Sequence, residues 1–172
     1  MFVFDATPLI TLAKSDHLDI VTSLDEMCLV PERVHAEVVE DGLAAGYPDA
    51  RRVRRAIDDG DLTVRACEES PLFDEADEIP NLSEADVAVL ALAAELDATA
   101  VMDETAGRAV AETENIRTRG TAYLVLRLVR DGAVTADDGR ELIDDLLDAG
   151  WYCSPDLYAK LLRKLETLDD AE

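Results

Sequence analysis

The chain has 172 residues, 48% of them apolar, so it can bury the core of one domain and is not an intrinsically disordered polymer. Sixteen basic residues face 39 acidic ones, and the net charge of −23 excludes long-range electrostatic attraction of nucleic acid in ordinary buffer. Three scattered cysteines argue against a disulfide framework, and the absence of a signal peptide or a long apolar run predicts a cytoplasmic protein that does not enter a membrane.

The first part of the chain alternates between predicted strands and helices. In chain order we predict a strand at 2–4, helices at 8–14 and 17–24, a strand at 27–30, helices at 31–42 and 48–60, and a strand at 62–66. Thr7 is the predicted cap of the first helix, with Pro8 in its first position. Gly42 is predicted to end the helix that Pro31 opens.

The second part begins with an acidic stretch at 68–81, which we interpret as a surface loop, with a short turn of helix as the alternative. A helix at 83–96 is apolar almost all round, which predicts burial. A strand at 99–102, a helix at 106–112, a strand at 115–118 and helices at 121–132, 136–150 and 155–166 follow.

This alternation indicates a parallel sheet with helices on its faces. The predicted fold class is therefore a three-layer α/β/α fold with a central sheet of four to five strands. We predict a single domain over residues 1–172, with residues 133–172 as a C-terminal helical extension.

Four carboxylates are expected to meet at one edge of this sheet. Asp5 follows the first strand and Asp103 the fourth, while Glu37 and Asp86 lie early in helices that follow the second and third strands. The carboxyl ends of parallel strands, and the helices that start there, share one edge. Two unit charges 4 Å apart repel by about 4 kcal/mol at an effective dielectric of 20, so a cation or a retained proton is needed.

Oxygen ligands of this kind select Mg²⁺ or Mn²⁺, and two histidines in the whole chain give little support for zinc. A carboxylate cluster with such a metal suits the hydrolysis of phosphodiesters. Other interpretations stay open at this point: Asp86 has the spacing of a capping box with Ser83, and Glu37 reads equally as a solvated helix acid.

Four blocks resemble the successive motifs of PIN-domain proteins, most of all the branch of VapC-type ribonuclease toxins. The blocks are "FVFDATPLI", "VPERVHAEVV", "LSEADVAVLALAAEL" and "AVMDETAGRAVAE", and the segments "RGTAYLVLRLVRDGAV" and "GWYCSPDLYAKLL" extend the likeness over nearly the whole chain. The order and spacing of the blocks are more specific than any one block. The resemblance implies a PIN-like α/β/α fold.

The resemblance also implies a metal-dependent ribonuclease with an acidic quartet. The quartet falls on Asp5, Glu37, Asp86 and Asp103. Thr7 matches a hydroxyl residue that supports the first aspartate, and Glu104 stands where many relatives carry a second aspartate. Arg108, one turn past Asp103, either contacts substrate phosphate or braces the cluster.

The resulting hypothesis is a Mg²⁺- or Mn²⁺-dependent endoribonuclease that cuts RNA by in-line attack of water. Asp5, Asp86 and Asp103 would hold the metal, and Glu37 would bind it directly or through water. The resemblance implies a small antitoxin as partner, and the apolar C-terminal helices suggest a homodimer. The alternatives are a catalytically inactive PIN-like binding or regulatory module and a haloacid-dehalogenase-like phosphatase, which needs a second aspartate where Thr7 stands.

The charge composition predicts a protein from a salt-loaded cytoplasm, such as that of a halophilic archaeon. Only three of the sixteen basic residues are lysines. Carboxylates keep a surface hydrated, and in molar salt the Debye length falls to about 3 Å, so local contacts with nucleic acid remain feasible. We therefore expect the free energy of unfolding to rise from low salt to molar KCl in urea titrations; equal or greater stability at low salt would contradict the hypothesis.

Overall fold

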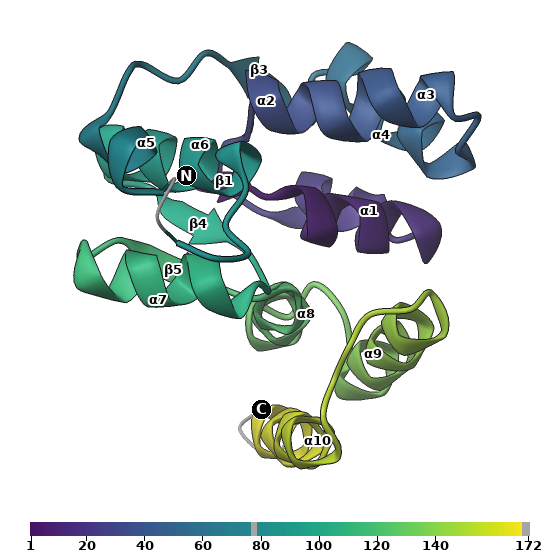
Figure 1. The fold of residues 1–172 in the computed structure, drawn as a ribbon. Coiled ribbons are helices and arrows are strands. Elements are labelled where there is room, and N and C mark those ends of the chain that lie inside the picture. The colour runs from purple at the N-terminus through teal and green to yellow at the C-terminus, as the bar shows by residue number, and fades with distance from the viewer. Residues whose placement is uncertain (77–78, 170–172) are drawn as a thin grey trace.

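A computed structural model describes residues 1–76 and 79–169 of the chain. Five parallel strands form one sheet in the order β3-β2-β1-β4-β5 (Figure 1). The strands are β1 (Phe2–Phe4), β2 (Cys28–Pro31), β3 (Thr63–Arg65), β4 (Thr99–Val101) and β5 (Arg117–Arg119). This sheet, with helices on its faces, confirms the predicted α/β fold class.

The central strands are buried because both faces of the sheet are covered. In β1, Val3 is fully buried and pairs in register with Leu29 of β2 and Ala100 of β4. Parallel sheets covered on both faces have such continuous apolar strands. The edge strand β5 instead reads Arg-Thr-Arg, and both of its arginines are exposed.

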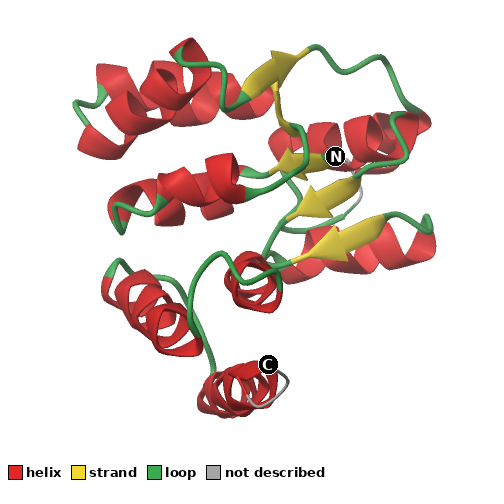
Figure 2. Ribbon diagram, turned by 180° about the vertical axis from the view of Figure 1, so that it is seen from behind, coloured by secondary structure: helices red, strands yellow, loops and turns green. Residues whose placement is uncertain are grey.

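Helices cover the two faces of the sheet as two layers (Figure 2). One layer contains α1 (Ala6–Lys14), α2 (Glu32–His35), η2 (Ala36–Asp41), α3 (Gly42–Ala44) and α4 (Pro48–Asp58). The other contains α5 (Pro71–Ala76), α6 (Glu84–Glu95) and α7 (Thr105–Thr113). The helix α6 is almost entirely buried, as its apolar sequence predicts.

The C-terminal helices follow β5 and pack on one another. They are α8 (Thr121–Arg130), α9 (Ala136–Asp148) and α10 (Pro155–Asp169). The α8 helix contacts the 3₁₀ helix η1 (Leu18–Ser23) that follows α1, and α9 and α10 both pack against α8 (Figure 1). Thr135 and Asp138 form a capping box at the start of α9. Within the described ranges, no helix is long and apolar enough to cross a bilayer.

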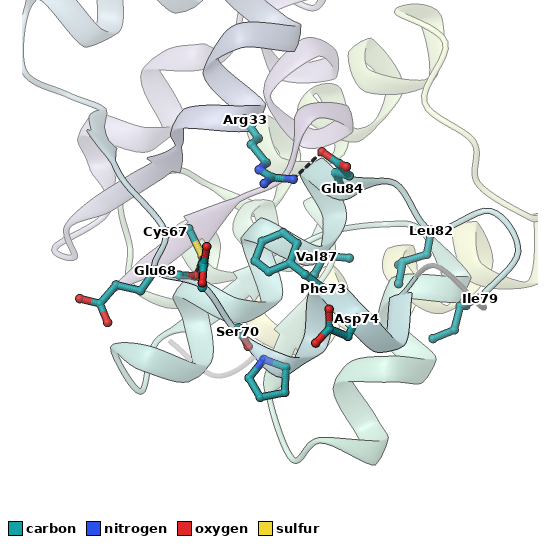
Figure 3. Close-up of a pocket in the computed structure, with 12 residues that line it drawn as sticks. Arg33, Cys67, Glu68, Ser70, Phe73, Asp74, Ile79, Leu82, Glu84 and Val87 are labelled. Carbon is teal, nitrogen blue, oxygen red and sulfur yellow. Dashed lines mark hydrogen bonds and ion pairs between the residues drawn. The ribbon is translucent and has the colours of Figure 1, made fainter.

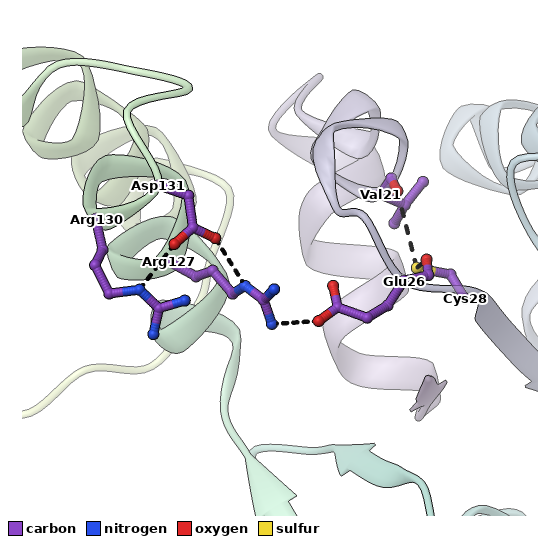
Figure 4. A network of polar contacts seen from close by, with 6 residues as sticks. All are labelled: Val21, Glu26, Cys28, Arg127, Arg130 and Asp131. Atoms are coloured by element: carbon purple, nitrogen blue, oxygen red, sulfur yellow. Dashed lines mark hydrogen bonds and ion pairs between the residues drawn. The ribbon is translucent and has the colours of Figure 1, made fainter.

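An ion-pair network ties α8 to the loop before β2 (Figure 4). The Arg127 guanidinium contacts Glu26 and Asp131, and it lies 5.8 Å from the centroid of the Phe2 ring. The Oε2 atom of Glu26 is buried without a hydrogen-bond partner among the described residues. The ion pair between the other oxygen, Oε1, and Arg127 offsets the cost of burying the Glu26 carboxylate. The network therefore anchors the C-terminal helices to the sheet at a position away from the carboxyl ends of the strands.

Several local predictions differ from the structure or match only their stated alternative. Thr7 does not cap the first helix: α1 begins at Ala6, and the Asp5 side chain accepts a hydrogen bond from the Ala6 backbone N–H (2.8 Å). The predicted helix at 17–24 is the shorter 3₁₀ helix η1. The 68–81 stretch contains a helix, α5, which corresponds to the alternative of a short helical turn.

Gly42 does not end its helix, because it is needed for close packing instead. A Cβ atom at Gly42 would lie 2.8 Å from the Cβ of Ala50 on α4, so only glycine fits there. The helix continues to Ala44 and is followed by Gly46 at φ +79, the left-handed conformation that glycine adopts readily. The preceding turns form the π-helix η2, and such wide turns are frequent at functional sites.

Candidate functional site

An open concavity lies where β1 and α6 present carboxylates at the carboxyl edge of the sheet. We call it the acidic cleft; its volume is about 610 Å³. Its polar lining consists of Asp5, Thr7, Glu37, Asn81, Ser83, Asp86 and Glu104. Among the described residues, no lysine, arginine or histidine lines it, so its four carboxylates share the cleft without a protein cation.

Asp5 is the most deeply buried acid of the cleft, with 2% of its surface exposed. Its backbone N–H donates to the carbonyl of Val101 (3.0 Å), which extends the ladder between β1 and β4 by one residue. Burial, and then the charge of Asp86, raises the pKa of Asp5 from 3.8 to about 7, although the hydrogen bond from Ala6 opposes the rise. Without a cation, Asp5 therefore retains its proton close to neutral pH.

Asp86 forms the capping box that its spacing with Ser83 suggested, and it also lines the acidic cleft. Its backbone N–H donates to the Ser83 hydroxyl (3.1 Å), and its Oδ2 accepts from the Ser83 backbone N–H (2.7 Å), which completes the capping box of α6. The same carboxylate raises the pKa values of Asp5 and Glu37 by its charge. The capping box fixes the direction of the side chain through Oδ2, and Oδ1 takes no part in the capping hydrogen bonds.

Glu37 and Glu104 complete the rim of the cleft. Glu37 lies in the first turn of η2, and although the residue is exposed overall, partial burial of its carboxyl group and then the charge of Asp86 raise its pKa. Glu104 is the N-cap residue of α7, but its side chain makes no capping hydrogen bond. The Glu104 carboxylate is therefore free of that role and can contribute to the cleft.

The carboxylate of Asp103 does not line the acidic cleft. Its Oδ1 accepts from the backbone N–H of Thr121 (2.9 Å), and its Oδ2 accepts from the Thr121 hydroxyl (2.6 Å) and the Trp151 indole N–H (3.2 Å). The first turn of α8 has unsatisfied N–H groups and no side-chain cap from Gly120, and Asp103 supplies the missing acceptor. Asp103 lines a neighbouring concavity together with Arg108.

The structure thus brings together Asp5, Glu37 and Asp86 of the predicted quartet, with Thr7 at the same cleft. It places Glu104 there and leaves Asp103 and Arg108 next to it. Sequence reasoning did not place Asn81 or Ser83 at the cleft, and it missed the partners of Asp103. The assignment of metal ligands remains a prediction.

The donor set of the cleft fits a hard divalent cation. Carboxylate, hydroxyl and amide oxygens are the ligands that Mg²⁺ and Mn²⁺ prefer. In residues 1–76 and 79–169, no three acidic, histidine or cysteine side chains converge closely enough to hold an ion as they stand. Repulsion between charged carboxylates opposes a closer approach of these side chains, and a bound cation would offset it.

A larger concavity of about 740 Å³ lies beside α5 and α6 (Figure 3). Arg33 crosses it, with its guanidinium 4.6 Å from the centroid of the Phe73 ring and an ion pair to Glu84. Leu82 lines both this concavity and the acidic cleft. The two are therefore neighbouring depressions of one surface.

Comparison with known protein families gives a match over nearly the whole chain. A family model described as a PIN domain matches residues 1–167. No curated protein and no solved structure matches the chain. The match therefore covers the sheet, the acidic cleft and nearly all of the C-terminal helices.

Proposed function

The chain belongs to the PIN-domain family, whose members are generally nucleases, and on this premise we propose that it is a metal-dependent endoribonuclease. The observation that carries the proposal is the meeting of Asp5, Glu37 and Asp86 in one cleft without a protein cation. These residues come from the end of β1, from η2 and from α6, so the fold gathers them from distant parts of the sequence.

In this proposal Asp5, Glu37 and Asp86 hold a Mg²⁺ or Mn²⁺ ion, and a fourth carboxylate comes from Glu104 or Asp103. The ion would supply Lewis-acid stabilisation of the phosphoryl oxygens and lower the pKa of a nearby water. Asp5 must release its proton as the ion enters, since the charged carboxylate is the ligand form. The hydroxyls of Thr7 and Ser83 at the cleft can donate hydrogen bonds to an anionic substrate.

Cleavage of a labelled mixed-sequence RNA in molar KCl with Mn²⁺ tests the proposal. We expect Glu37→Gln and Asp86→Asn to lower the rate of RNA cleavage on the order of 100-fold or more. Even residues that only support metal ligands typically contribute 10- to 100-fold to metal affinity or activity. Glu40→Gln is a suitable control, since Glu40 is an exposed acid of the same π-helix outside the cleft. A larger loss for Glu104→Gln than for Asp103→Asn would identify Glu104 as the fourth ligand.

Unchanged cleavage by both Glu37→Gln and Asp86→Asn would contradict the proposed site. If wild-type protein gains thermal stability with Mn²⁺ but cuts none of a panel of RNAs, the binding-module alternative is favoured. The phosphatase alternative requires a second aspartate at the position of Thr7, and an aspartyl-phosphate trapped on Asp5 would revive it.

We further propose that the ribonuclease is a cytoplasmic toxin paired with a small antitoxin, acting as a homodimer in a halophilic cell. The support for the toxin role is the resemblance of the motif blocks to VapC-type toxins, and the support for the habitat is the net charge of −23. Growth arrest on induction of the wild-type chain, absent with Asp5→Asn, is the measurement that tests the toxin role.

A further inference from the structure

Next to the acidic cleft lies a concavity with the opposite balance of charge, which we call the arginine groove. It has a volume of about 630 Å³ and runs between α7 and the edge strand β5. Three arginines, Arg108, Arg117 and Arg119, line it against two carboxylates, Asp103 and Glu112. The whole chain has 16 basic and 39 acidic residues, so the groove has more basic than acidic residues although the chain as a whole has the reverse.

Two of the three guanidinium groups form no ion pair among the described residues. Arg119 donates to the carbonyl of Thr118 (2.8 Å) and lies 5.0 Å from the centroid of the Tyr123 ring. Neither Arg119 nor Arg108 forms a salt bridge within residues 1–76 and 79–169, whereas Arg117 pairs with Asp97. Arg108 and Arg119 thus keep hydrogen-bond donors available for an anion.

Gly120 leaves room for the Asp103 carboxylate at the end of the groove, next to Arg108. A Cβ atom at Gly120 would lie 2.8 Å from Oδ1 of Asp103 and 3.7 Å from Nη1 of Arg108. The absence of a side chain therefore makes room for the Asp103 carboxylate, and the Arg108 guanidinium lies at ordinary contact distance from the same position. The Asp103 oxygens already accept three hydrogen bonds from Thr121 and Trp151, which leaves the guanidinium donors of Arg108 uncommitted.

The arginine groove lies directly beside the acidic cleft. Asp103 lines the groove and the next residue, Glu104, lines the cleft, so the turn between β4 and α7 separates them. Arg119 ends β5 in register with Val101, and its carbonyl accepts from the backbone N–H of Met102 (2.9 Å). Two strand spacings, about 10 Å, separate the end of β5 from the end of β1, so one nucleic-acid strand reaches both sites.

We propose that the arginine groove binds the phosphodiester backbone of the RNA strand beside the scissile phosphate, with Arg108 and Arg119 as the contacts. This inference rests on the proposed nuclease function and adds the path of its substrate. Guanidinium groups bind phosphate oxygens through paired hydrogen bonds, which suits a local contact in a protein whose net charge repels RNA. The hydroxyl of Thr105, which also lines the groove, adds a donor beside Arg108.

The affinity of a fluorescent single-stranded RNA, measured by anisotropy in EDTA over a range of KCl concentrations, tests the inference without any cleavage. We expect Arg108→Gln and Arg119→Gln each to weaken binding and to reduce the slope of log K against log salt by about 0.7, the value for one phosphate contact on a single strand. In the double variant, the slope of log K against log salt should fall by about twice that amount.

Arg54→Gln is the matched control. Arg54 is exposed on α4, which packs on α1 and η2 in the other helical layer, and its replacement changes the net charge equally. Equal slopes and affinities for Arg54→Gln and the two groove variants would overturn the inference, even if wild-type protein cuts RNA. Weakened binding by the groove variants alone would support it, even if no cleavage is found. Unchanged melting temperatures show that the variants remain folded.

Discussion

Replacing Asp5 with asparagine is expected to stabilise the metal-free protein at pH 8 and to remove its response to Mn²⁺. Burial and the charge of Asp86 raise the pKa of Asp5 in the folded protein to about 7, against 3.8 ordinarily. The folded state therefore binds this proton more tightly than the unfolded state, so the free energy of unfolding falls as the pH rises from about 4 to 7. The free energy of unfolding falls by about 1.4 kcal/mol for each pH unit in this range, so the total loss reaches about 4 kcal/mol.

Asparagine does not titrate, so Asp5→Asn avoids this loss and still offers an oxygen to the Ala6 N–H. In urea denaturation with EDTA, we expect the variant to exceed wild type by up to about 4 kcal/mol at pH 8 and by little at pH 4. Mn²⁺ at 100 times its dissociation constant should add about 2.7 kcal/mol to wild type and nothing to the variant.

A surface control distinguishes this effect from a general loss of negative charge. Asp19 is an exposed acid in η1, and Asp19→Asn should change stability by less than about 0.5 kcal/mol at either pH. If Asp5→Asn is less stable than wild type at pH 8, or if it gains the same free energy of unfolding at pH 4 and pH 8, then folding does not raise the pKa of Asp5.

The gathering of Asp5, Glu37 and Asp86 was predictable because it depends on topology alone. Continuous apolar runs such as residues 2–4 mark buried parallel strands, and the ends of such strands share one edge. The edge strand β5 was harder to recognise, since its exposed Arg-Thr-Arg sequence lacks the apolar signal of a covered strand.

The placement of Asp103 and Glu104 could not be predicted in the same way. They are adjacent residues at one strand end, and the edge rule does not tell which carboxylate enters the cleft. The outcome depends on Thr121 and Trp151, which lie 18 and 48 residues further along the chain. One signal was present in the sequence: Gly120 offers no side-chain cap for α8, so an acceptor had to come from another element.

Removal of the Asp103 side chain should consequently be among the most destabilising single changes in the C-terminal half. Asp103→Ala leaves the buried Thr121 N–H and hydroxyl and the Trp151 indole N–H without their acceptor. An unsatisfied buried donor costs about 1–3 kcal/mol, so we expect a loss of about 4 kcal/mol in urea denaturation. Trp151→Phe removes one donor but keeps an aromatic ring, and should cost about 1–2 kcal/mol.

Glu104→Ala is the matched control for this prediction, because it removes the adjacent carboxylate from an exposed position without breaking a capping hydrogen bond. Equal effects of Asp103→Ala and Glu104→Ala on unfolding would show that the hydrogen bonds of Asp103 do not support α8. Trp151 is the single tryptophan of the chain, so its emission reports directly on its bond to Asp103. If Asp103 leaves this bond to bind a cation, Mg²⁺ should shift the emission of wild type; if Glu104 is the ligand, the emission should stay constant while Mg²⁺ raises the melting temperature.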